Sequence, residues 1–295
     1  MDMKRMHEYS KVWADPPEKS ICSTRVSRIS SNALAENVSD RLIVEQALTV
    51  MVDRVGSFTI MCTPSDIEAL AVGFVFSEGM IDGIDDVLAL TTKKQLPNVV
   101  GIQIYDPSRI AIRRNLIVAS SCGMCGVRNI DKMLTDIPPS PRSLEISGDS
   151  VIRLARELRS MQPAFRATGG SHAAGLFNAD GEIITFGEDI GRHSALDKAI
   201  GKCLLSRKSM RGCGAVLSGR ASFEMVAKAA RAGLEAIVAV SAPSSFAIEA
   251  AHRWNITLCG FVRSQRANIY THPERIYACQ EKKNVSQTEE VDPWK

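Results

Sequence analysis

The second half of the chain alternates apolar runs with amphipathic stretches, and this alternation restricts the fold more than any other feature. The stretches with helical spacing are 194–205, 222–232 and 246–253, and the apolar runs beside them are 215–217, 236–240 and 257–262. Strands that alternate with helices along a chain favour a sheet with helices on both faces. The run 267–271 follows directly, and we expect it as an antiparallel strand at the edge of the sheet.

Further elements precede this alternation. Residues 150–161 place apolar side chains at helical spacing. The runs 173–177 and 183–186 predict a hairpin, because residues 178–181 read Asn-Ala-Asp-Gly, a sequence suited to a tight turn. The sequence therefore predicts an α/β domain over residues 141–280.

A smaller mixed α/β lobe is expected in front, over residues 41–140. Its predicted strands are 42–52, 57–62, 99–105 and 116–119, and a Pro-rich linker at 137–141 ends it. A helix should follow the second strand, with Thr63 as its cap and Pro64 at its first position. Residues 1–40 and 281–295 are polar, and both predict flexible ends.

Composition excludes several classes of protein. The net charge is only +3, too little for a nucleic-acid-binding protein. No run of apolar residues is long enough to cross a membrane, and the first residues lack the apolar segment of a secretory signal. Because the eight cysteines are scattered, a disulfide framework is not expected, and a cytoplasmic location is.

Two of the cysteines stand close together, in the sequence Cys122-Gly123-Met124-Cys125-Gly126. The pair follows an apolar run and precedes a predicted helix at 127–134. A helix N-terminus favours the thiolate, which is the nucleophilic and metal-binding form of cysteine. The flanking glycines allow a sharp turn that leaves both sulfurs accessible.

Several interpretations of this pair compete. A thioredoxin-like site would lie near the start of a βαβ unit, whereas this pair lies mid-chain. A structural zinc site needs two further ligands, and no second close cysteine pair exists. A zinc deaminase needs an upstream His-x-Glu, but His7 is the only histidine before Cys122. Sulfur chemistry is favoured, and two buried structural cysteines remain the alternative.

Four loops of the α/β region carry residues suited to an anionic ligand. They are 168–172, 187–193, 218–222 and 241–245. In open α/β sheets ligands bind beyond the carboxyl ends of the strands, and helix N-termini there favour phosphate. The candidate ligand-binding side chains are His172, Arg192, His193, Ser218 and Arg220. No Walker A or G-x-G-x-x-G pattern occurs, so an ordinary NTPase or dehydrogenase is not indicated.

Together these motifs resemble the FdhD family, sulfur carriers required for formate dehydrogenase activity. The resemblance rests on the cysteine pair, the loops 168–172, 189–193 and 218–222, the helix 69–78 and the segment 260–273, and it extends over about residues 44–275. It implies a cytidine-deaminase-like, three-layer α/β/α domain without the zinc signature, and a homodimer.

The resemblance also implies a function. A cysteine desulfurase would load sulfur onto Cys122 as a persulfide, with Cys125 assisting. The sulfur would then pass to molybdenum in the bis-(molybdopterin guanine dinucleotide) cofactor that formate dehydrogenase receives. GDP should mimic part of that cofactor, and the implied cofactor-binding segment is Phe261, Val262, Arg263, Ser264, Gln265 and Arg266. The alternative is a cofactor chaperone that binds the guanine nucleotide and has structural cysteines only.

Overall fold

The computed structural model describes residue 17 and residues 19–93, 96–107 and 136–278. The predicted strand 116–119, the cysteine pair, the helix 127–134 and the tail 281–295 lie outside the described residues. The limits of the predicted domains stay predictions.

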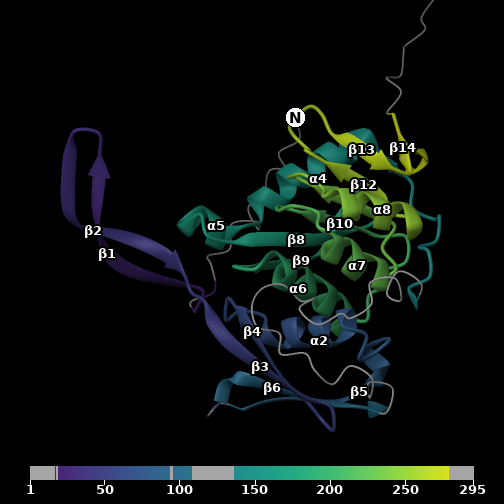
Figure 1. The fold of residues 1–295 in the computed structure, drawn as a ribbon, viewed down its shortest axis with the longest axis horizontal. Helices are drawn as coiled ribbons and strands as arrows, with labels where there is room; N and C mark the ends of the chain where they lie inside the picture. Colours follow the sequence, from purple (N-terminus) through teal and green to yellow (C-terminus); the bar gives the residue numbers. More distant parts are fainter. Residues whose placement is uncertain (1–16, 18, 94–95, 108–135, 279–295) are drawn as a thin grey trace, which may run out of the picture.

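A six-stranded mixed sheet forms the centre of the α/β region (Figure 1). Its order is β13-β12-β11-β10-β8-β9, with the bounds His172–Phe177 (β8), Ile183–Asp189 (β9), Gly214–Leu217 (β10), Ala236–Ala239 (β11), Thr257–Gly260 (β12) and Asn268–Thr271 (β13). Strands β10, β11 and β12 are parallel, and β8, β9 and β13 each run antiparallel to their neighbours. The predicted hairpin and antiparallel edge strand are confirmed.

Helices cover both faces of this sheet. Helix α4 (Gly148–Ser160) packs on one face, where Val216 and Val238 enter its core. Helices α6 (Arg192–Leu205), α7 (Phe223–Arg231) and α8 (Ser245–Arg253) pack on the other. Alternate residues of a strand point to opposite faces, so the apolar runs of β10 and β11 supply both cores. The predicted α/β class with its three layers is confirmed.

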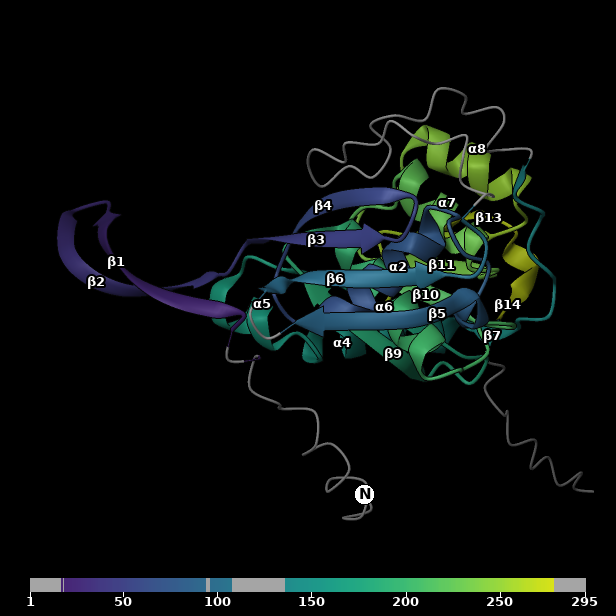
Figure 2. The ribbon, with the colours of Figure 1, turned by 90° about the horizontal axis from the view of Figure 1, so that it is seen from below.

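The front lobe is a four-stranded sheet with one helix against it. The sheet has the order β4-β3-β6-β5, with the bounds Gln46–Val52 (β3), Gly56–Cys62 (β4), Val87–Lys93 (β5) and Leu96–Ile104 (β6). Helix α2 (Ile67–Ser77) is almost wholly buried, because it lies between this sheet and α6 (Figures 1 and 2). Strand β5 was not predicted.

Helix α2 begins later than the sequence predicted. Asp66 stands at the cap position, and no side chain caps the helix. Thr63 instead turns toward the α/β region, where its Oγ1 accepts a hydrogen bond of 3.1 Å from the backbone N–H of Ile190. The predicted cap at Thr63 is wrong because a contact between the lobes uses that hydroxyl.

The predicted flexible arm is also wrong for residues 21–40. Strands β1 (Ile21–Ser30) and β2 (Ala33–Ile43) form an antiparallel hairpin that extends away from the body (Figure 1). Its base lies close to the α/β region, since a Cβ atom added at Gly170 would come within 2.9 Å of Ile43. The β-forming residues of this stretch stand between many serines, so the sequence read as polar and its strands were not predicted.

Two glycines bring helices α2 and α6 into backbone contact. A Cβ atom at Gly73 would lie 1.9 Å from the carbonyl oxygen of Asp197, and one at Gly201 would lie 1.8 Å from that of Ala69. Real Cβ atoms do not approach backbone oxygens so closely, so only glycine permits this packing. The junction between the lobes therefore depends on the absence of two side chains.

We expect Gly201→Ala to destabilise the protein by about 1–3 kcal/mol, because the added methyl group must push α2 and α6 apart. Gly83→Ala is the matched control, since Gly83 has an extended backbone and nothing within 4 Å of its added Cβ. The control should change the free energy of unfolding by less than about 0.5 kcal/mol. Urea denaturation measures both, and equal stabilities would contradict the close helix packing.

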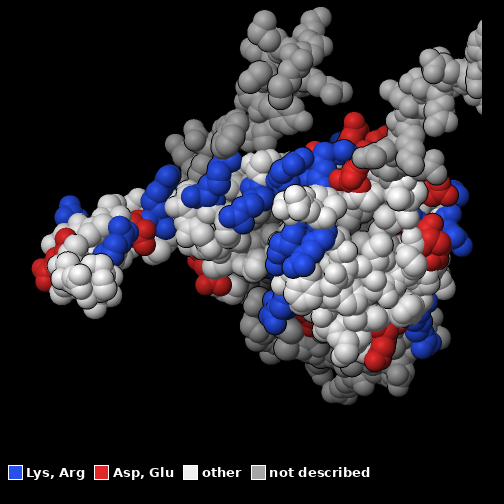
Figure 3. Space-filling view, turned by 90° about the horizontal axis from the view of Figure 1, so that it is seen from above, with Lys and Arg blue, Asp and Glu red and all other residues white. Residues whose placement is uncertain are grey.

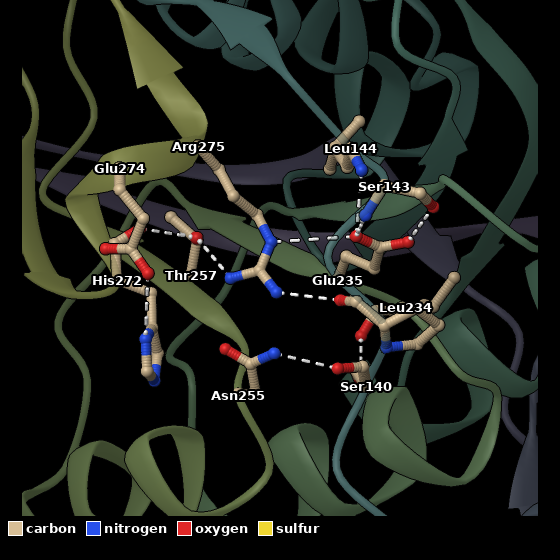
Figure 4. Close-up of polar contacts among 11 residues, drawn as sticks. Ser140, Ser143, Leu144, Leu234, Glu235, Asn255, Thr257, His272, Glu274 and Arg275 are labelled. Carbon is tan, nitrogen blue, oxygen red and sulfur yellow. Dashed lines mark hydrogen bonds and ion pairs between the residues drawn. The ribbon is translucent and has the colours of Figure 1, made fainter.

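A buried ion pair attaches the linker and the C-terminal segment to the sheet (Figure 4). Glu235, directly before β11, accepts hydrogen bonds from the backbone N–H groups of Ser143 and Leu144, at 2.6 and 2.8 Å. Arg275 Nε lies 3.6 Å from the same carboxylate, and Arg275 Nη2 donates to the carbonyl oxygen of Pro141 at 2.8 Å. Burial alone would raise the pKa of Glu235, but these donors and the guanidinium lower it overall.

The sign of the pH dependence follows. The folded pKa of Glu235 lies below its ordinary value of 4.5, so its stabilisation is complete above that value and is lost as the pH falls through the folded pKa. Glu235→Gln should remove this part of the acid sensitivity. It should also cost about 3 kcal/mol near pH 7, because Arg275 then stays buried without a counter-charge. Urea titrations at several pH values test this, and parallel stability curves for variant and wild type would contradict it.

Candidate functional site

Five loops meet at one edge of the six-stranded sheet. Strands β10, β11 and β12 end at this edge, and antiparallel β8 begins there, with Ala174 opposite Leu217. The last residue of β9, Asp189, pairs with His172, the first residue of β8. The register therefore collects all four predicted loops and the segment after β12 at one place. This is the carboxyl edge, where α/β sheets bind ligands.

A cavity of about 580 Å³ opens between this edge and helices α4 and α5 (Pro163–Thr168). Its apolar walls are Ile152, Ala155, Leu158, Phe165, Val240 and Val262. Its polar lining includes Gln162, Ser171, His172, Ser218 and Ser264. A concave, mostly apolar site with a few polar groups is typical of small-molecule binding.

Three arginines stand at the cavity. Arg156 and Arg159 come from α4, Arg263 follows β12, and all three are exposed. The Arg159 guanidinium lies 5.3 Å from the centre of the Phe165 ring, close enough for a cation–π contact. Figure 3 shows Lys and Arg side chains gathered on the face beside the β1–β2 hairpin. One guanidinium group can donate two parallel hydrogen bonds to the oxygens of a phosphate, so a cavity with three arginines suits an anionic ligand.

The carboxylate of Glu188 fixes the loop between α5 and β8. It accepts hydrogen bonds from the backbone N–H groups of Ala164 and Phe165, at 3.1 and 2.8 Å, and from Ser171 Oγ at 2.6 Å. The Glu188 side chain therefore holds the start of α5.

His172 lies where the cavity meets a basic cluster. Its Nδ1 is 3.4 Å from Ser218 Oγ, which also accepts a 2.8 Å hydrogen bond from the backbone N–H of Ala173. Burial lowers the pKa of His172, and the nearby charges of Arg192, Arg220 and His193 lower it further. His172 is therefore neutral near pH 7, and an anion placed here would meet concentrated positive charge.

Of the other residues of this cluster, Arg192 and His193 lie in the first turn of α6, and Arg220 lies in the loop before α7. His193 Nε2 is 2.7 Å from a carboxylate oxygen of Glu224, which joins the starts of α6 and α7. Within the described ranges, Arg192 Nε and His193 Nδ1 are buried without a hydrogen-bond partner. His172, Arg192, His193, Ser218 and Arg220 are thus gathered at one edge, but only His172 and Ser218 line the cavity.

The segment 261–266 also has some residues that line the cavity and others that do not. Val262 is buried, and Val262, Arg263 and Ser264 line the cavity. Arg263 is held by its own loop and by the residue that follows β11, because its Nη1 donates to the carbonyl oxygens of Val262 and Val240 at 3.0 and 2.5 Å. Phe261, Gln265 and Arg266 are exposed and do not line the cavity.

Sequence reasoning missed the wall formed by α4 and α5. Arg156, Arg159, Gln162 and Phe165 all line the cavity, and none was a candidate. Arg156 and Arg159 stand three residues apart on an amphipathic helix, so their shared face was readable from the sequence. Nothing in the sequence indicated that this face meets the strand ends.

The predicted catalytic residues Cys122 and Cys125 lie outside the described residues. Among the other cysteines, Cys62, Cys203, Cys213 and Cys259 are buried free thiols. Burial raises the pKa of Cys62 and of Cys259 to about 12 and that of Cys203 to about 11. These thiols are poor nucleophiles. Cys22, in the hairpin, is exposed.

The part of the chain that the structure describes contains neither a metal-binding cluster nor a helix that could span a membrane. No three His, Cys, Asp or Glu side chains in that part of the chain are grouped to hold a metal ion. No helix there is long and apolar enough to span a membrane.

Fold and site together define an α/β protein with an arginine-lined ligand cavity at the carboxyl edge of its sheet. The sequence model of the FdhD/NarQ family matches residues 43–277, and the chain belongs to this family.

Two relatives named as sulfur carrier proteins match 81% or more of this chain. The chain is 37% identical over 283 residues to the sulfur carrier protein FdhD of Bordetella parapertussis. This match covers 94% of this chain and 100% of the relative. The chain is 39% identical over 245 residues to the sulfur carrier protein FdhD of Picrophilus torridus, covering 81% and 93%. A solved structure from Desulfotalea psychrophila, described as a proposed formate dehydrogenase accessory protein, shares the fold with a TM-score of 0.69 at 23% identity, covering 87% and 99%.

Proposed function

We propose that this protein is a sulfur carrier that serves formate dehydrogenase. It accepts persulfide sulfur from a cysteine desulfurase on Cys122 and passes it to molybdenum in the bis-(molybdopterin guanine dinucleotide) cofactor. The observation that carries this proposal is the match, over the whole length of the relative, to a protein named as a sulfur carrier. The cavity supports it, because its volume and its arginines suit a nucleotide end of such a cofactor.

The loading step requires a reactive thiolate. The Cys122 thiolate attacks the outer sulfur of the desulfurase persulfide, the S–S bond breaks, and the desulfurase cysteine leaves as a thiolate. Cys122 then carries the persulfide. An acceptor that supplies two electrons would take the outer sulfur as sulfide, which breaks the S–S bond and leaves the Cys122 thiolate for another cycle. The buried cysteines of the described lobes do not compete, because burial raises their thiol pKa values far above neutral pH.

The cavity residues divide the work of binding the cofactor. Arg156, Arg159 and Arg263 would meet phosphates at the cavity, and the apolar walls would hold a planar ring. Neutral His172 and the positive edge around it would favour further anionic groups. In this proposal the protein carries sulfur as a cysteine persulfide intermediate. It works in the cytoplasm and forms a homodimer.

Incubation with a cysteine desulfurase and cysteine should add one sulfur atom to the wild-type protein, and a reductant should remove it. Cys122→Ala should abolish this gain in mass, and Cys125→Ala should reduce it. Cys22→Ala is the matched control, because Cys22 is an exposed thiol of the hairpin and should not affect sulfur uptake. Intact-protein mass spectrometry measures all four proteins.

The outcome decides between the two functions. Full uptake of sulfur by Cys122→Ala contradicts the mechanism. A wild-type protein that binds GDP but never gains sulfur would establish the alternative, a chaperone of the guanine nucleotide with structural cysteines.

The geometry also ranks the arginines of the segment after β12. Arg263→Ala should weaken the binding of GDP by about 1.5–3 kcal/mol, because Arg263 lines the cavity and can make a charged hydrogen bond. Arg266→Ala should weaken it less, since Arg266 is exposed outside the cavity. Calorimetry tests this order, and a larger loss at Arg266 would place the nucleotide outside the cavity.

A further inference from the structure

The β1–β2 hairpin, residues 21–43, projects from the body without a third strand beside it (Figures 1 and 2). Among the described strands, β1 and β2 pair with each other alone, so both outer edges leave backbone N–H and C=O groups without a strand partner. A two-stranded hairpin by itself is only marginally stable in water. Beyond its base, where β2 contacts α5, the hairpin therefore needs a surface to lie against.

The tip of the β1–β2 hairpin is apolar. Ile29 and Leu34 stand directly opposite each other across the two strands, and they are 82% and 63% exposed. Leu42, nearer the base, is 44% exposed. Single exposed apolar side chains are common, but a matched pair at the end of a projecting hairpin is costly to leave in water. The pair therefore indicates a contact surface.

The sheet of the front lobe presents a matching surface, which is its outer face. One face of this sheet packs on α2, and alternate residues of the four strands point the other way. Figure 2 looks onto that outer face. Its members on the described strands are Ala47, Thr49, Met51, Ser57, Thr59, Met61, Ala89, Thr91, Val99, Gly101 and Gln103.

None of these eleven residues of the outer face is charged. Charged residues make up 23% of the chain, and they are normally concentrated on exposed surfaces such as this one. Met51, which is 50% exposed, adds a large apolar side chain. An apolar tip and an uncharged face suit each other, because neither surface has to strip water from a charge when they meet.

The size of the β1–β2 hairpin favours a second copy of this chain as the occupant. Ten residues of β1 span about 33 Å, and two strands are about 10 Å wide, so one face of the hairpin offers about 330 Å². The contact hides the same area on the opposing surface, which gives about 660 Å² for one hairpin, the size of a chance contact. Twofold symmetry doubles this to about 1,300 Å², within the range of stable interfaces.

The direction of the β1–β2 hairpin permits a reciprocal contact. It leaves the body at the start of β3 and points away from the front sheet in both views (Figures 1 and 2). Its strands, at about 33 Å, are longer than the seven residues of β3, at about 23 Å, so it can cross the outer face of a second copy. Residues 21–43 carry three arginines and two carboxylates, so two such hairpins do not repel each other strongly.

We propose that two copies of this chain exchange their β1–β2 hairpins, and that Ile29 and Leu34 of each copy pack against the outer face of the other. The inference rests on the proposed function only for the expectation of a homodimer, and it adds the surface by which that dimer forms. Neither the hairpin nor the outer face lines the cavity. The contact can therefore be broken without changing a residue of the cavity.

Charges placed on the two surfaces test the contact. Sedimentation velocity on the full chain gives the Kd of self-association. A tip variant, Ile29→Glu with Leu34→Glu, and a face variant, Met51→Lys with Thr59→Lys, should each weaken self-association at least tenfold, because charges must then lose water at the contact. Ile269→Glu is the matched control, since Ile269 is 43% exposed on β13, away from the front lobe (Figure 1), and it should associate as the wild type does.

A mixture of the tip variant and the face variant gives the decisive comparison. In a mixed pair the acidic tip of one copy meets the basic face of the other, while the remaining tip and face are both wild type. Mixed pairs should form at concentrations at which either variant alone is monomeric. Only folded hairpins and folded front lobes can restore the association, so misfolding cannot produce this result.

Three results would overturn the inference. If the wild type stays monomeric, no second copy covers the hairpin. If either variant associates as tightly as the wild type, or if the mixture does not restore association, the tip does not lie on the outer face. Sulfur uptake by the wild type is a separate measurement. A failed hairpin contact therefore leaves the proposed sulfur carrier standing, and failed sulfur uptake leaves the hairpin contact standing.

Discussion

The contact between helices α2 and α6 is the constraint on which the rest of the structure depends. At Gly73 and Gly201 the two backbones touch directly, so the front lobe and the α/β region meet in close helix contact. Buried charges reinforce it. Lys198 Nζ lies 2.7 Å from Asp189 and donates to the carbonyl oxygen of Thr63 at 3.0 Å.

A second buried pair lies along the same helix. Asp197 accepts hydrogen bonds from Lys228 Nζ at 2.8 Å and from Ser77 Oγ at 2.7 Å, so one carboxylate joins α2, α6 and α7. Removing either partner of such a pair leaves an uncompensated buried charge. These pairs therefore fix the position of α6 against its neighbours, and with it the positions of Arg192 and His193, which begin α6 at the edge of the sheet.

The sequence predicted what local patterns control. The apolar runs of β10, β11 and β12 and the Asn-Ala-Asp-Gly turn were readable because strand periodicity and turn chemistry are local properties. The gathering of the loops at one edge followed from the order of the strands. What the sequence could not supply was tertiary partnership. Thr63 looked like a helix cap, but its hydroxyl bonds the other lobe, and no pattern of spacing records that choice.

The candidate site was predictable in the same partial way. His172 and Ser218 could be found because their loops adjoin strands at the carboxyl edge, and Arg263 was implied by the resemblance to the family. Gln162 and Phe165 could not, because they reach the cavity only through the short helix α5, which carries no strong periodicity in six residues. Ligand-binding residues on a neighbouring wall need the packing of that wall, which only the structure shows.

The end of β9 connects the lobe junction to the cavity. Two consecutive carboxylates there serve opposite sides: Glu188 holds the first residues of α5 and Ser171, and Asp189 holds Lys198 and the backbone N–H of Thr63. Lys198 Nζ also donates to the backbone carbonyl oxygen of Glu188 at 3.1 Å. Lys198 therefore connects the contacts of Glu188 with those of Asp189. A displacement of α2 against α6 must therefore move the strand end that positions α5. Because Gln162 and Phe165 belong to this connection, the geometry of the cavity depends on how the front lobe is seated.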